Sequence, residues 1–137
     1  MKITGSCLCG AVTLSCNAAP IRARTCWCRL CQYLAAGNAT VNLVFPAESV
    51  ALTGDVTWYD SVAESGNHMS RGFCGKCGTP VFSKSAEFAQ FLIIRAGALD
   101  DLKSLPPQAT IWTSEAPAWA HIDPDLPHFP QQPPPVT

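Results

Sequence analysis

The fold of this chain is decided where residues 74–78 read CGKCG, because two cysteines stand there three residues apart, each followed by a glycine. A second pair lies in residues 6–10, which read SCLCG. Zinc binds thiolates in a tetrahedron at about 2.3 Å, so cysteines two or three residues apart can share one ion. The glycines let the backbone turn its N–H groups toward the sulfurs. The two pairs therefore predict a structural zinc that fastens the N-terminus to the middle of the sheet, with the ligands Cys7, Cys9, Cys74 and Cys77.

Three more cysteines form the cluster C-x-C-x-x-C, at Cys26, Cys28 and Cys31. Three protein ligands and one open position are the arrangement of a catalytic zinc. The start of a short helix and the cations Arg24 and Arg29 would favour thiolates at this cluster. We therefore predict a second, open zinc site at these three cysteines and expect function to reside there. Two zinc ions per chain are expected, of which the second is more easily lost.

Two other arrangements of the cysteines remain open. In a cross-paired arrangement, Cys7 and Cys9 complete the middle cluster. In a disulfide framework, the clusters pair with one another, although cysteines at positions i and i+2 of an extended segment lie at the outer edge of disulfide geometry. Residues 1–6 contain no apolar stretch long enough for a secretory signal. We therefore expect a cytoplasmic protein, in which such cysteines bind metal.

Length and composition predict a single globular domain. The chain has 137 residues, of which 47% are hydrophobic and 14% charged, and its formal net charge is −1. Nucleic-acid-binding proteins normally carry a basic surface, and no apolar run approaches the roughly 20 residues of a membrane span. We therefore expect neither a nucleic acid nor a membrane as a partner. The low charge and the four tryptophans are compatible with a homo-oligomer.

The hydrophobic pattern predicts a mainly β domain with little helix. Strands are expected at residues 11–16, 40–45, 49–52, 56–59, 80–83, 91–96 and 110–113. Gly54 and Asp55 predict a hairpin between the third and fourth of these strands. The best helix candidates are residues 29–35 and 116–120. Cys16 lies in the apolar register of the first strand and is predicted to be a core residue rather than a ligand.

The domain is expected to comprise residues 1–122, followed by a proline-rich tail. Half of the twelve prolines lie in residues 123–137. Proline cannot donate a hydrogen bond to a strand ladder. The tail is therefore expected to be an extended strap that does not pair in a sheet and frays at its end.

Three segments occur in a characteristic order: residues 5–12 read GSCLCGAV, residues 26–31 read CWCRLC, and residues 71–82 read RGFCGKCGTPVF. Residues 96–101 (AGALDD) and 116–119 (APAW) follow. Together they resemble the glutathione-dependent formaldehyde-activating enzyme family over about residues 3–130. The resemblance implies a β-tent of stacked antiparallel sheets with two zinc sites. The structural zinc would be held by Cys7, Cys9, Cys74 and Cys77, and the catalytic zinc by Cys26, Cys28 and Cys31.

The activity that the resemblance implies is that of a carbon–sulfur lyase, which joins formaldehyde to glutathione as S-(hydroxymethyl)glutathione and catalyses the reverse. A substrate thiol would lose its proton at the open zinc site and attack an aldehyde held beside it. Arg71 and Arg95 are candidates for binding a glutathione carboxylate. The proton has no convincing donor, although His68 is the best of the histidines His68, His121 and His128. Many family members carry histidine where this chain has Trp27, which would pack against the core or line a pocket.

Two other functions remain open. Relatives with the same β-tent act as protein-binding domains, and centromere protein V resembles the family too. In a non-catalytic interaction module of this kind, a fourth protein ligand would close the three-cysteine site, or the site would stay empty. A thiol or metal sensor would use the three clustered thiols reversibly. The fourth position distinguishes these functions, because only an enzyme needs it to be open to a thiol from outside.

Overall fold

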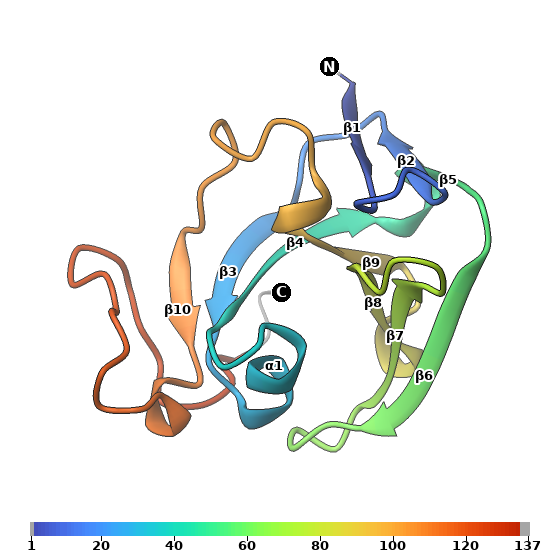
Figure 1. Ribbon diagram of the computed structural model, residues 1–137. Coiled ribbons are helices and arrows are strands. Elements are labelled where there is room, and N and C mark those ends of the chain that lie inside the picture. The colour runs from blue at the N-terminus through green and yellow to red at the C-terminus, as the bar shows by residue number, and fades with distance from the viewer. Residues whose placement is uncertain (1, 135–137) are drawn as a thin grey trace.

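Two β-sheets and one short helix make up the computed structural model, which describes residues 2–134 (Figure 1). The helix is α1 (Arg29–Leu34). The strands are β1 (Ile3–Ser6), β2 (Thr13–Cys16), β3 (Arg22–Cys26), β4 (Thr40–Pro46), β5 (Val50–Thr53), β6 (Val56–Val62), β7 (His68–Cys74), β8 (Pro80–Ser85), β9 (Phe91–Arg95) and β10 (Ala109–Ile111). The predicted mainly β class is confirmed. Within residues 2–134, no helix has the length and apolar character needed to cross a membrane.

The two sheets differ in size, and together they enclose the core. The smaller sheet has the order β1-β2-β5, and the larger has the order β10-β3-β4-β9-β8-β7-β6. The larger sheet is strongly curved, and α1 lies inside the curve (Figure 1). Neighbouring strands are antiparallel except for β10 and β3, which run parallel. One edge of the large sheet therefore departs from the antiparallel pairing of the other strands.

The apolar core lies between the two sheets. Its fully buried side chains include Leu43 and Phe45 of β4, Phe82 of β8 and Ile94 of β9. Burial of such a side chain contributes about 1.5–3 kcal/mol. Cys16 is also fully buried in this core, with its Sγ 3.2 Å from the Ser49 hydroxyl, as the alternation of β2 predicts.

The predicted hairpin around Gly54 is wrong, because β5 pairs with β2 in the small sheet whereas β6 pairs with β7 in the large one. Gly54 instead carries the chain from one sheet to the other. Its φ is +102°, and a Cβ at this position would lie 2.1 Å from the carbonyl oxygen of Ala11. Only glycine tolerates both the positive φ and this close approach. Residues 116–120 are not helical either, and a 3₁₀ turn, Thr113–Glu115, precedes them.

The proline-rich tail pairs with β10, contrary to the expectation that it would not pair. The N–H of Thr110 donates to the carbonyl of Pro127, and the N–H of Phe129 donates back to the carbonyl of Thr110, both at 2.9 Å. In this pairing Pro127 contributes only its carbonyl, and Phe129, which lies between two prolines, contributes its N–H. The Phe129 side chain then packs against Cys26 and Ile111. Residues 135–137, at the end that was expected to fray, lie outside the described residues.

Candidate metal centres

The first cysteine cluster contains Cys7, Cys9, Cys74 and Cys77, whose Sγ atoms all lie within 4.8 Å of one another. The Sγ of Cys9 is 3.7 Å from that of Cys7 and 3.7 Å from that of Cys74. Four sulfurs at about 2.3 Å from a central ion in a tetrahedron would lie about 3.8 Å apart. These residues could therefore hold a metal ion. The cross-paired arrangement is wrong, because Cys7 and Cys9 join the later pair.

The four-cysteine cluster connects the two sheets. Cys7 follows β1 of the small sheet, and Cys74 ends β7 of the large sheet. The N–H of Val12 donates to the Cys7 sulfur at 3.3 Å, and the N–H of Lys76 donates to the Cys74 sulfur at 3.4 Å. The hydrogen bond from Val12 lowers the pKa of Cys7. The glycines after the second cysteine of each pair have the positive φ that this curl requires, +82° at Gly10 and +78° at Gly78.

The second cluster brings together Cys26, Cys28 and Cys31, again with all Sγ atoms within 4.8 Å. Cys26 ends β3, and Cys28 caps α1, since its sulfur accepts the N–H of Cys31 at 3.3 Å. In residues 2–134, no other cysteine, histidine, aspartate or glutamate joins this group. All eight cysteines are free, so the disulfide framework is not formed. The cluster could hold a metal ion through three protein ligands.

The electrostatics of the three-cysteine cluster favour a bound cation. Hydrogen bonds with Cys26 and Cys28 lower the pKa of Cys31 to about 2. The hydrogen bonds of Cys26 with Cys28 and Cys31, by contrast, raise the pKa of Cys26. Burial adds to the cost of ionising more than one of these thiols, because the negative charges repel one another. All three can become thiolates only when a positive charge is placed among them.

Arg95 of β9 contributes positive charge beside this cluster. It is 8% exposed, and its charge lowers the pKa of Cys31 together with a hydrogen bond from Thr40. Burial lowers the pKa of Arg95 itself, and the charge of Cys31 raises it. Arg29, which was predicted to favour the thiolates, instead places its guanidinium 4.9 Å from the centre of the Tyr33 ring.

A buried glutamine, Gln32, positions the loop that carries these cysteines. Its Nε2 donates to the carbonyls of Trp27 and Glu115, at 2.8 and 2.9 Å. Its Oε1 accepts a hydrogen bond from Arg29 at 2.7 Å. The side chain thereby ties α1 and the Cys26–Cys28 loop to the 3₁₀ turn after β10. Neither Gln32 nor Thr40 belongs to a recognisable sequence motif, since their importance depends on partners far away along the chain.

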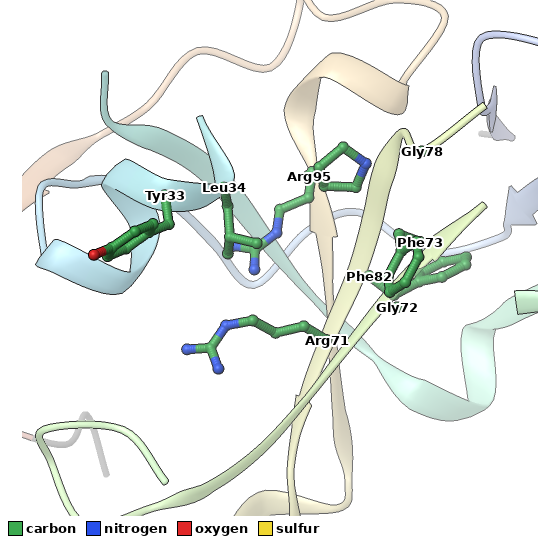
Figure 2. A pocket seen from close by; sticks show the side chains of 9 residues that line it. Tyr33, Leu34, Arg71, Gly72, Phe73, Gly78, Phe82 and Arg95 are labelled. Carbon is green, nitrogen blue, oxygen red and sulfur yellow. The ribbon is translucent and has the colours of Figure 1, made fainter. Parts of the chain in front are cut away.

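A cavity of about 250 Å³ lies between α1 and the strands β7, β8 and β9. Figure 2 shows Arg71 and Arg95 reaching from the strands toward α1 beside Tyr33 and Leu34. The residues that line the cavity are Tyr33, Leu34, Arg71, Gly72, Phe73, Gly78, Pro80, Phe82 and Arg95. The two arginines that were predicted as anion-binding residues are therefore brought together, and Arg95 connects the cavity to the three-cysteine cluster.

None of the three histidines lines this cavity. His68 lies at the exposed start of β7, where its Nδ1 is 2.6 Å from a Glu87 carboxylate oxygen. His121 and His128 are exposed. Trp27 is 3% exposed and packs edge-on against Trp119, with ring centroids 6.4 Å apart. Of the two positions predicted for Trp27, the structure therefore shows the packed one.

Comparisons with known proteins agree with this geometry. The sequence model of the family described as glutathione-dependent formaldehyde-activating enzyme matches residues 2–115. Among curated proteins, no sequence matches the chain. The fold is similar to the crystal structure of a Rhodobacter sphaeroides protein that was a structural genomics target, with a TM-score of 0.56 and 19% sequence identity, over 71% of this chain and 87% of the other. Because the family match spans most of the domain and includes both cysteine clusters, the chain belongs to the glutathione-dependent formaldehyde-activating enzyme family.

Proposed function

We propose that this protein is a zinc-dependent enzyme of the carbon–sulfur lyase type that acts on a thiol–aldehyde adduct such as S-(hydroxymethyl)glutathione. One observation carries the proposal: a cluster of three cysteines has no fourth cysteine, histidine, aspartate or glutamate from residues 2–134, and the charge of Arg95, which lines the cavity, acts on Cys31. An interaction module with a closed three-cysteine site would need such a fourth ligand, whereas a module whose site stays empty would not. Family membership supplies the substrates, glutathione and formaldehyde.

The two clusters are proposed to hold zinc for different purposes. Cys7, Cys9, Cys74 and Cys77 would hold a structural zinc, because four thiolates complete a tetrahedron. Cys26, Cys28 and Cys31 would hold a second zinc and leave one coordination position for the substrate. When bound, this zinc supplies Lewis acidity, which lowers the pKa of a thiol that reaches it.

The protein's own side chains would prepare the cavity for the adduct. Arg95 would offset the negative charge of the cysteine cluster, and the apolar side chain of Leu34 would limit the access of water to the carbon–sulfur bond. When this bond forms, the sulfur loses a proton and the aldehyde oxygen gains one. None of the histidines lines the cavity, so none of them is assigned to this proton transfer.

Location and domain boundary are also proposals. All eight cysteines are free thiols, which fits the reducing cytoplasm. We keep residues 1–122 as the zinc-binding domain and residues 123–137 as the tail, although the tail is held to β10 by backbone hydrogen bonds. The expected partners are a small thiol and an aldehyde.

Exchange between glutathione and S-(hydroxymethyl)glutathione tests the proposed reaction. In exchange NMR spectra at constant formaldehyde, the zinc-loaded protein should raise the exchange rate at least about tenfold above the uncatalysed rate, equivalent to about 1.4 kcal/mol of barrier. The Cys16→Ser variant, altered at a cysteine outside both clusters, should give the same acceleration. An unchanged rate with fully loaded protein would contradict the proposed reaction and favour a binding module.

A further inference from the structure

We propose that Trp112 and Phe129 form an aromatic cover over the three-cysteine site, and that the proline-rich tail carrying Phe129 is a strap that must open before a thiol as large as glutathione reaches the site. This inference rests on the proposed function only in taking the site as the place where a thiol enters. The family match ends at residue 115, so the tail lies outside what the family model describes. The cover has its own support in packing, hydrogen bonding and backbone conformation.

The apolar surroundings of the three-cysteine site are separate from the main core. Within residues 2–134, Cys26 and Cys31 are each 6% exposed and form a small buried cluster with Ile111 of β10. The half-buried apolar side chains that pack against this cluster, besides Cys28, are those of Trp112 and Phe129. The cover of the site therefore comes from the residue that follows β10 and from the tail beside it (Figure 1).

The backbone of Trp112 has an unusual conformation at this point. Its φ is +59° and its ψ is 36°, in the left-handed region that residues with bulky side chains rarely adopt. Its indole Nε1 donates a hydrogen bond to the side-chain oxygen of Gln132, in the tail, at 3.3 Å. Conformations of this kind persist only where the surroundings hold them, and they occur preferentially at functional sites. The surroundings that hold the Trp112 side chain are the cysteine cluster and the tail.

The tail is fastened in a way that allows it to open by itself. The N–H of Phe129 donates to the carbonyl of Thr110 at 2.9 Å, and the carbonyl of Phe129 accepts from the N–H and the hydroxyl of Thr113, both at 3.1 Å. These bonds lie at the margin of the molecule, because β10 is the terminal strand of the large sheet. A segment held by edge hydrogen bonds and few buried side chains opens more readily than a central strand. Its prolines limit the conformations of the detached tail, which reduces the entropy lost when it closes again.

Two maleimides of different size test the cover on the full-length, zinc-loaded protein. Peptide mass spectrometry follows the modification of Cys28 by N-methylmaleimide and by N-phenylmaleimide, with the exposed Cys9 of the other cluster as the internal reference. Relative to Cys9, Cys28 should react with the smaller reagent about tenfold or more faster than with the larger one. Equal relative rates in the unaltered protein would overturn the cover.

Variants of Phe129 assign the effect. Phe129→Ala should remove most of the discrimination by size, whereas Phe129→Leu should keep part of it and guards against loss of folding in the first variant. His128→Ala removes the exposed neighbouring side chain and should change nothing, because successive side chains of an extended segment point to opposite faces. A discrimination that survives Phe129→Ala would overturn the cover while leaving the proposed function intact. If Phe129→Ala abolishes the discrimination but the unaltered protein does not accelerate glutathione exchange, the cover stands and the proposed function fails.

Hydrogen exchange of the same protein tests the opening of the strap. The N–H of Phe129 should exchange at least about tenfold faster than that of Leu43 in β4, which is paired on both sides, because the tail opens without the sheet. Equal protection of the two groups would show that the tail opens only when the whole domain unfolds, and would overturn the strap.

Discussion

Replacement of Cys74 by serine should leave the protein without a cooperative unfolding transition. Cys74 is 1% exposed and belongs to the cluster that joins the small sheet to the large one. Structural zinc contributes about 10–16 kcal/mol of binding free energy in small zinc domains. The free energy of unfolding of a whole domain is only about 5–15 kcal/mol. Loss of one ligand should therefore remove most of the stability.

Circular dichroism during heating measures this loss, with a matched variant beside it. Cys16→Ser replaces another fully buried cysteine that belongs to neither cluster. This variant should still melt cooperatively, because it loses only the packing of one small core side chain. If Cys74→Ser melted cooperatively near the melting temperature of the unaltered protein, the four-cysteine cluster would not be what holds the two sheets together.

Replacement of Cys28 by serine should have the opposite pattern, with the fold retained and the second metal lost. Cys28 is half-buried and caps α1 through its side chain. Serine is a favoured N-cap residue, so the helix keeps its cap. Removing even an outer partner of a metal ligand costs about 10–100-fold in affinity or activity. Loss of a ligand itself should therefore return the exchange rate to the uncatalysed rate.

Elemental analysis and calorimetry on the same samples check this result. Zinc should fall from two ions per chain to one, while the melting temperature changes by only a few degrees. The contrast with Cys74→Ser is the decisive comparison. Equal destabilisation by the two variants would show that both clusters are structural and would remove the basis for an open site.

Much of the fold was predictable because its signals are local. Strands β4, β8 and β9 are rich in apolar, β-forming residues, a signal that does not depend on which strand each of them pairs with. The helix α1 begins at Arg29, as predicted. By contrast, the predicted strands do not include β1, β3 or β7. Strand β3 (RARTC) is largely polar and β7 (HMSRGFC) mixes polar and apolar residues, and each of these two becomes a strand because neighbours on both sides provide a ladder. The Gly54 turn was misassigned because turn chemistry does not identify the sheet that the next strand joins.

The same distinction holds for the candidate sites. Spacing grouped the seven cysteines of the two clusters correctly, since neighbouring ligands are two or three residues apart. Arg95 approaches Cys31 only because β9 pairs with β4, which in turn pairs with β3. Strand pairing of this kind is not encoded in any short stretch of sequence. For that reason, Arg29 was expected to act where Arg95 does, and Gln32 was overlooked.

Cys26, Cys28 and Cys31 are proposed to hold a zinc ion with one position open to a substrate thiol. Crystals of zinc-loaded protein soaked with glutathione, measured at the zinc absorption edge, test this arrangement. We predict two zinc peaks per chain, one surrounded by four cysteine sulfurs and the other by three cysteine sulfurs and the sulfur of glutathione. A disulfide within the triplet, or a fourth side chain of the protein on the second zinc, would contradict the account.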